Sequence, residues 1–427
     1  MAILNPTRQK LIGNVAWLYA LQGLNYVIPL AVLPYLVRVL GIERFGLLAF
    51  AQAFAQYFVM LSDYGFNLSA TKQVARRRGS REDVSRLFWS VLFIKFALML
   101  FGCLLLFVIL AAVPRFRADS TVYVIAYVAV PGSILFPVWL FQGMEQMRYI
   151  SIVNGGARLL SAMLLFIFVH HSSDYMLALA IQSGGILLAG MAALWTALSN
   201  FDIDFCWPSR ADISQTLGDG WHLFVSSSAT MLYANTGAFL VGVLAGNVQA
   251  GYFGAADKIN RGIQGLLTPI TQAVYPHVSL LAANSRDAAL AFIRKSLIGI
   301  GLVSFLPSLL VLLLARPVAL FVFGSITQDC VVTLRWMAML PFVIAVSSVF
   351  AIQTMIPFGF ERQLSRIYVV AGLGSLALSV PLILHYGAAG AGASVLAVEI
   401  FVDTAMWSVL RQHGVHVLRA EPVMARI

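Results

Sequence analysis

The chain has 427 residues, of which 60% are hydrophobic and 11% charged, and its formal net charge at pH 7 is +10. A soluble domain carries about 25% charged residues, so this composition excludes a soluble globular enzyme. The positive charge does not indicate nucleic-acid binding, because the basic residues form no stripe on one soluble face and fall in alternate loops instead.

Twelve apolar segments follow one another along almost the whole chain. A bilayer core about 30 Å thick needs roughly 20 apolar residues per helical span, and every segment meets this length. The first segment lacks a convincing small-residue cleavage site, so we expect a retained span. The sequence therefore predicts an all-α polytopic membrane protein with 12 transmembrane helices, at residues 13–37, 45–66, 88–113, 121–143, 149–170, 176–198, 218–244, 249–275, 296–315, 333–357, 366–385 and 389–411.

The distribution of basic residues predicts the orientation in the membrane. If the amino terminus is cytoplasmic, most of the Arg and Lys lie on the cytoplasmic side, including the run from Arg76 to Arg78. The opposite side then receives few cations. By the positive-inside rule, both termini are expected in the cytoplasm. The cations assigned to the outer side are Arg38, Arg44, Arg115, Arg117 and Arg316.

The two halves of the sequence look like copies of each other. The apolar and glycine pattern from Leu36 to Ala51 recurs from Leu240 to Ala256, with one residue inserted before the first glycine of the second copy. Because each half has an even number of spans, both halves enter from the same side, as in parallel repeats. We expect an amino-terminal lobe at 1–200, a cytoplasmic inter-lobe loop at 201–217 and a carboxy-terminal lobe at 218–427, around a central cavity.

Several cations fall inside predicted spans. A charge that faces lipid at mid-bilayer costs at least roughly 2.5 to 3.5 kcal/mol, so these side chains must face water or pair with one another. We predict that they line a cationic, substrate-binding cavity, with structural ion pairs as the alternative. The four cations are Lys95, Arg158, Lys258 and Arg261.

Acidic residues inside spans are candidates for coupling or gating. Glu399 and Asp403 are four residues apart on the last span, so their carboxylates lie one helical turn from each other and repel. One of them could carry a proton during a transport cycle, whereas a salt bridge to Lys258 or Arg261 is the competing interpretation. Asp63 and Asp257 are the next candidates.

The sequence offers little for an enzyme. Cys103, Cys206 and Cys330 suggest no disulfide framework, and we find neither a metal-ligand cluster nor the glycine-rich loop that binds ATP phosphates. We therefore expect no cofactor and no catalysis, with a gradient of H⁺ or Na⁺ as the energy source. An integral polymerase or glycosyltransferase remains a remote alternative, although the loops are short for one.

Several patterned motifs resemble one family. They are LPYLVRVLGIERFGLLAFAQAF at Leu33–Phe54 and LSDYGFNLSATKQVARRR at Leu61–Arg78, followed by segments at Pro137–Ser151, Ala250–Ser279 and Leu334–Phe342. These motifs are similar to those of bacterial lipid-linked oligosaccharide flippases, which export O-antigen and capsule repeat units.

The resemblance implies a fold and a cargo. The fold is that of the multidrug, oligosaccharidyl-lipid and polysaccharide exporters, in which two six-helix bundles open alternately to either side of the bacterial inner membrane. The cargo is an undecaprenyl-diphosphate-linked oligosaccharide, and other polysaccharide assembly proteins are possible partners, with no role for nucleic acid. An ion-coupled multidrug antiporter of the same fold is the alternative, although its cavity should be acidic or aromatic.

Overall fold

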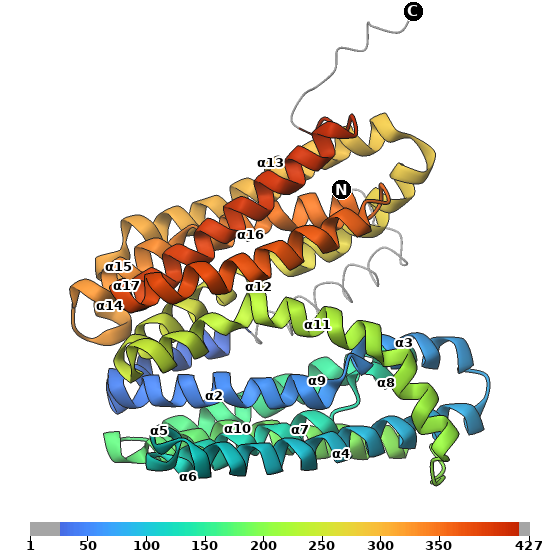
Figure 1. Ribbon diagram of the computed structural model, residues 1–427, viewed down its shortest axis with the longest axis horizontal. Coiled ribbons are helices and arrows are strands. Elements are labelled where there is room, and N and C mark those ends of the chain that lie inside the picture. The colour runs from blue at the N-terminus through green and yellow to red at the C-terminus, as the bar shows by residue number, and fades with distance from the viewer. Residues whose placement is uncertain (1–25, 418–427) are drawn as a thin grey trace, which may run out of the picture. The chain divides into compact units, whose positions relative to one another are not determined.

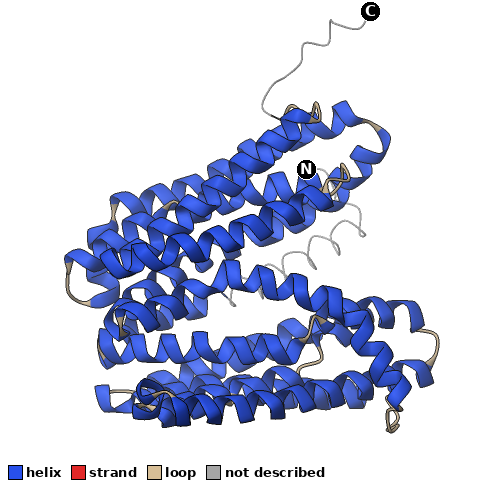
Figure 2. Cartoon of the chain, in the orientation of Figure 1, coloured by secondary structure: helices blue, strands red, loops and turns tan. Residues whose placement is uncertain are grey.

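The computed structural model of the chain describes residues 26–417, and a number of side chains within two of its long helices are not described. Throughout the described range the secondary structure is helical, without strands (Figure 2). The all-α fold predicted from the apolar segments is therefore confirmed. The part of the predicted first span that precedes Tyr26 lies outside the described residues.

The chain divides into two compact units. The first takes in Val39–Met231, and within it α2 runs beside α4 and α10 (Figure 1). Its elements are α2 (Ile42–Asp63), α3 (Phe66–Arg77), α4 (Arg81–Ala112), α5 (Pro114–Ala118), α6 (Ser120–Tyr127), α7 (Ala129–Leu135), α8 (Val138–Gly143), α9 (Met147–Phe168), the 3₁₀ turn η1 (Ser172–Asp174), α10 (Tyr175–Asn200) and the first part of α11 (Arg210–Ala245).

The second unit takes in the rest of α11 and the chain beyond it, together with Pro29–Arg38 of the helix at Tyr26–Leu40. Within it α16 packs between α13 and α17 (Figure 1). Its other elements are α12 (Asn247–Asn284), α13 (Arg286–Leu313), α14 (Ala315–Phe323), α15 (Gln328–Ala338), α16 (Leu340–Ser348), the π-helical segment η2 (Val349–Met355) and α17 (Glu361–Gln412).

Eight helical stretches in the described part of the chain are long and apolar enough to cross a membrane. The longest of them, α17, covers the last two predicted spans and is broken at Gly387, where φ is 56° and ψ is −133°. The break frees the N–H of Ala388, which donates to Oε1 of Gln249 at 2.9 Å. Gln249 in turn donates to Asp329 at 2.8 Å, so α12 holds the break in place.

The suggested internal repeat has a counterpart in the backbone. Gly41 precedes α2 with φ 77° and ψ 159°, and Gly246 precedes α12 with φ 89° and ψ 178°. The carbonyl of each glycine accepts the first helical hydrogen bond at 3.0 Å, from Phe45 and from Ala250 respectively. Because side chains disfavour positive φ, glycine is needed at both junctions.

Two expected loops are partly helical. The predicted spans leave residues 67–87 as a loop, but α3 occupies the first half of this stretch. It follows a break at Tyr64 and Gly65, both of which have positive φ. The expected inter-lobe loop at 201–217 ends early, because α11 begins at Arg210. A reciprocal cap explains this start: Asp212 N–H donates to Oγ of Ser209, and Ser209 N–H donates to the Asp212 carboxylate.

Small residues let helices of the first unit pack closely. A Cβ added at Gly190 of α10 would lie 2.2 Å from the carbonyl oxygen of Gly132 in α7, and one at Gly185 would meet Ser161 of α9. Such contacts are typical of membrane helices, which gain stability from close packing. In the second unit, α13, α16, η2 and α17 share one buried apolar core that includes Ile293, Val349 and Val402.

Candidate functional site

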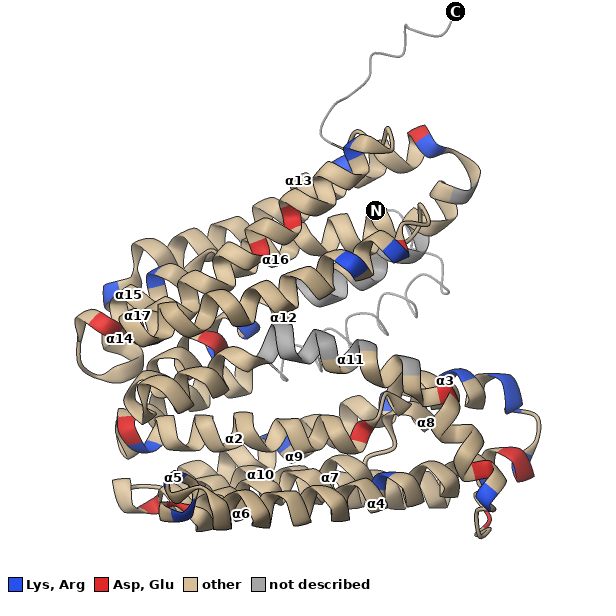
Figure 3. Ribbon diagram, in the orientation of Figure 1, with Lys and Arg blue, Asp and Glu red and all other residues tan. Residues whose placement is uncertain are grey.

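Most charged residues lie near helix ends, and few occupy the middles of long helices (Figure 3). Seven of the eight predicted site residues lie within long helices, and the eighth, Asp63, ends α2. Four of the eight form salt bridges: Lys95 with Asp63, and Arg261 with Asp257.

In the first unit, Lys95 of α4 is almost completely buried, with 3% of its side chain exposed. Its Nζ lies 2.8 Å from Oδ1 of Asp63, the last residue of α2. The other carboxylate oxygen of Asp63 accepts a hydrogen bond of 2.9 Å from Asn67 in α3. The ion pair that was the alternative for Lys95 is thus present, and it joins α2, α3 and α4 at the α2–α3 break.

Arg158 lies on α9, in a stretch where its neighbours Leu159 and Leu160 are also exposed. Helix α9 contacts α8 and α10. The cavity that the four cations are predicted to share stays a prediction.

In the second unit, α12 carries three predicted charges. Lys258 is half-buried. Asp257 Oδ2 accepts a hydrogen bond of 2.6 Å from Nε of Arg261, one turn along the same helix. Asp257, a predicted candidate for coupling or gating, is thus paired with Arg261 of its own helix.

Glu399 and Asp403 of α17 share one hydroxyl group. Ser347 Oγ, on α16, lies 2.5 Å from Oδ1 of Asp403 and 3.4 Å from Oε2 of Glu399. Glu399 is buried, and Tyr368 lies near enough to both carboxylates to interact with their charges. The oxygen atoms of Ser347, Glu399 and Asp403 therefore converge inside the second unit. A proton or a hard cation such as Na⁺ would be stabilised there.

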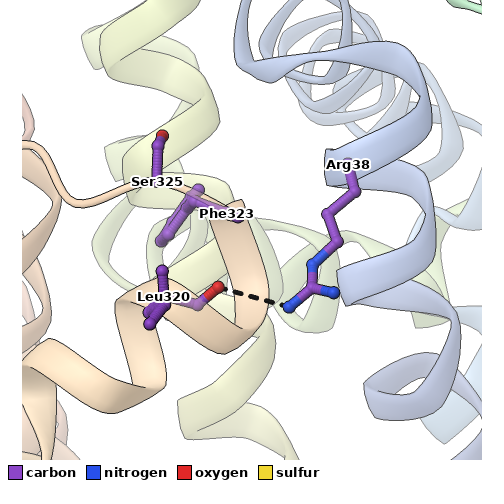
Figure 4. Close-up of a pocket in the computed structure, with 5 residues that line it drawn as sticks. Arg38, Leu320, Phe323 and Ser325 are labelled. Atoms are coloured by element: carbon purple, nitrogen blue, oxygen red, sulfur yellow. Dashed lines mark hydrogen bonds between the residues drawn. The ribbon is translucent and has the colours of Figure 1, made fainter.

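A pocket of about 490 Å³ lies at the end of α14 in the second unit (Figure 4). Arg38 points into it and donates from Nη2 to the carbonyl oxygen of Leu320 at 3.2 Å, and also to that of Phe321. Gly324 closes the helix in the left-handed conformation. Because the last carbonyls of a helix carry partial negative charge, Arg38 acts here as a cap that joins the first helix to α14.

Some polar residues were missed by the sequence analysis. Ser347 could have been noticed as part of a Ser-Ser pair in an apolar span, and Asn67 lies one turn after Asp63. Gln353 is fully buried in η2, and among the described residues neither polar atom of its amide has a hydrogen-bond partner. Segments of π-helix often occur at functional sites, and this one interrupts the tenth predicted span.

Within residues 26–417, no three His, Cys, Asp or Glu side chains come together as a metal site. The three cysteines are free thiols.

Apolar helices in two units, with charges buried between helices of each unit, define a polytopic membrane protein whose polar centres lie within the membrane-spanning region. The chain belongs to the polysaccharide biosynthesis protein family, whose model matches residues 11–282. It is 35% identical over 410 residues to a protein of Escherichia coli K12 named as an O-antigen transporter, covering 96% of this chain and 99% of that one. A protein of Shigella dysenteriae with the same name is 32% identical over 91% of this chain and 97% of its own length.

Solved structures agree on the fold. The lipid II flippase MurJ in an inward closed conformation matches with a TM-score of 0.73 over 94% of this chain and 87% of MurJ, at 11% identity. An inward-facing multidrug resistance transporter of the MATE family matches with a TM-score of 0.64 over 92% of this chain and all of that chain, at 14% identity. The family predicted from the motifs is therefore confirmed, and so is the exporter fold.

Proposed function

We propose that the chain is a flippase that moves undecaprenyl-diphosphate-linked oligosaccharide repeat units from the cytoplasmic to the periplasmic leaflet for surface polysaccharide assembly. One observation carries the proposal: nearly the whole chain matches proteins named as O-antigen transporters. The motifs and the MurJ-like fold support it. The protein then acts in the bacterial inner membrane, with both termini in the cytoplasm, and meets the lipid bilayer and other polysaccharide assembly proteins.

Reconstitution tests this function directly. Purified protein in liposomes, given a fluorescent polyprenyl-diphosphate oligosaccharide in the inner leaflet, should make the sugar accessible to a lectin added outside. Empty liposomes and liposomes with heat-inactivated protein provide the background. No lectin accessibility above this background, with the protein shown to be folded, would contradict the proposal.

The second candidate is an ion-coupled multidrug antiporter of the same fold, which the MATE-family neighbours favour only through their shared fold. The half-buried Lys258 suits an anionic cargo better than a cationic drug. Cation-driven efflux of cationic dyes by the same liposomes, without glycolipid movement, would support the antiporter. An altered glycan after incubation would support the remote alternative, an integral polymerase or glycosyltransferase.

We propose that Arg158 and Lys258 bind the diphosphate of the cargo. A diphosphate presents several acceptor oxygens with negative charge, and a Lys or Arg in a site of low dielectric binds it through short, charge-assisted hydrogen bonds. Lys95 and Arg261 already have carboxylate partners in Asp63 and Asp257. These two cations can contact the cargo only when their pairs open, so we assign them a secondary part in binding.

We propose that Glu399 and Asp403, with the hydroxyl of Ser347 between them, take up the coupling ion, H⁺ or Na⁺. Uptake of a cation cancels the repulsion between the carboxylates, which favours the packing of α17 against α16 in one state of the cycle over another. Asp63 and Asp257 are each held by a cation, so their coupling role would require those pairs to exchange during transport.

A further inference from the structure

Asp204 hydrogen-bonds the segment between α10 and α11 to α4. Three α4 side chains spaced four residues apart, and so on one helix face, all bind it. Nη2 of Arg81 donates to Oδ1 at 2.7 Å, Asp204 N–H donates to Oγ of Ser85 at 3.1 Å, and Nε1 of Trp89 donates to the Asp204 carbonyl oxygen at 3.0 Å.

The residues that follow continue along the same face of α4. The ring of Phe205 meets Trp89 at a centroid distance of 4.8 Å, and Trp207 meets Phe93, the next residue in the four-residue series, at 6.2 Å. Both aromatic residues are held in place, yet Phe205 is 65% exposed and Trp207 is 76% exposed. A short ordered segment thus displays two large aromatic side chains.

The exposed face of α4 indicates what surrounds the side chains of Phe205 and Trp207. Beyond Phe93 this helix continues with Phe96, Leu100 and Leu104, each at least half exposed, and its apolar length suits a membrane span. In a multi-pass membrane protein such a face contacts lipid chains. Asp204, which precedes the two aromatic residues, pairs with Arg81 at the charged start of α4. Aromatic residues between an apolar face and a charged end are typical of the membrane–water interface.

We propose that Phe205 and Trp207 form a membrane-interface anchor, held on α4 by Asp204 and seated among the lipid head groups. The occupant of this surface is the bilayer itself. The anchor fixes the depth of the first unit in the membrane and ties the segment after α10 to that unit. This inference depends on the membrane location and is independent of the cargo.

Fluorine NMR can place Trp207 directly. The full-length protein, labelled with fluorotryptophan and reconstituted in nanodiscs, has 8 tryptophans, and the Trp207→Phe variant assigns the resonance. A doxyl spin label near the head of the lipid chain should broaden this resonance strongly, and a gadolinium chelate in the water should broaden it weakly. Strong broadening by the chelate with none by the lipid label would overturn the proposal and would favour a protein partner for this surface.

A matched pair of variants tests the role of Asp204. Asp204→Asn combined with Trp89→Phe removes the ion pair and one hydrogen bond, so the lipid-label broadening of Trp207 should fall at least twofold. Asp202→Asn makes the same charge change two residues away, at an exposed position, and should leave the broadening unchanged. Equal broadening in the two variants would show that Asp204 does not hold the anchor.

Discussion

Several charged residues inside the described helices of this protein pair with one another, and this determines what each can do. Lys95 and Asp63 show it most clearly, since a lysine that is almost fully buried meets a carboxylate at the break between α2 and α3. Removal of one partner from a buried pair leaves the other charge uncompensated, at a cost of about 3 to 5 kcal/mol.

We therefore predict that Lys95→Ala lowers thermal stability in detergent markedly, measured as the folded fraction that remains on size-exclusion chromatography after heating. The double variant Lys95→Ala with Asp63→Ala should recover part of the loss, because neither charge is then left alone. Lys72→Ala, at an exposed position of α3, is the control and should melt like the parent protein. Identical melting of the Lys95 and Lys72 variants would show that the pair contributes nothing.

The carboxylate pair of α17 leads to a prediction about coupling. With Glu399→Gln and Asp403→Asn, the glycolipid should still bind to reconstituted protein, while transport driven by an imposed H⁺ or Na⁺ gradient is lost. Ser347→Ala should weaken the gradient dependence, since its hydroxyl contacts both carboxylates. Glu361→Gln at the exposed start of α17 is the control. Transport with an unchanged gradient dependence in both carboxylate variants would move the coupling site elsewhere.

The sequence identified charged residues inside the spans, but it did not identify their partners. A charge inside an apolar span can be recognised from the sequence because its burial cost depends on composition and length alone. Whether Lys95 meets Asp63 or open water depends on how α2 and α4 are rotated about their axes, which composition does not determine. The Asp257–Arg261 pair is different. Its four-residue spacing is visible in the sequence, because residues four apart lie on one face of a helix.

At the scale of elements, the break in α17 depends on a glycine whose replacement would lower the stability of the fold. Gly387 has positive φ, and a Cβ there would lie 2.6 Å from Oε1 of Gln249, the atom that accepts the hydrogen bond from Ala388. Strain of this kind costs about 1 to 3 kcal/mol. The break therefore requires both this backbone conformation and the space beside Gln249.

We predict that Gly387→Ala lowers thermal stability and that Gly374→Ala, in the same helix, does not. Gly374 has open space around its would-be Cβ, and alanine in a helix is favoured over glycine by roughly 0.5 to 1 kcal/mol. Gln249→Ala should also destabilise, because it leaves the Ala388 N–H without its acceptor. Equal stability of the two glycine variants would mean that α17 can bend without a glycine at 387.

The helices could be predicted from the sequence where their position depends on hydrophobicity alone. Each predicted span falls on helix in the described residues, since apolar length is a strong signal. Helix α3 was missed because its three cations make it look like a solvated loop, although its Phe66, Ala70 and Val74 repeat with helical spacing and are buried. The start of α11 was also missed, although Ser209 and Asp212 have the three-residue spacing of a helix cap.

For the whole molecule, the strongest prediction concerns the cargo. Arg158→Ala or Lys258→Ala should abolish export of the lipid-linked glycan while the protein remains in the membrane, because each change removes a cation proposed to bind the diphosphate. The readouts are the surface polysaccharide of complemented cells and the amount of the variant in membrane fractions. Arg362→Ala and Lys295→Ala, both at exposed positions, are the controls. Normal polysaccharide in both test variants would contradict the assignment.

The glycines before α2 and α12 bear on how the gene arose. Gly41 and Gly246 share a backbone conformation that side chains disfavour, so neither position could drift to another residue without strain. Such a constraint preserves a trace of common descent after most of the surrounding sequence has diverged. The matching glycines at the two junctions are what an internal duplication would leave, in keeping with the repeat that the sequence predicts.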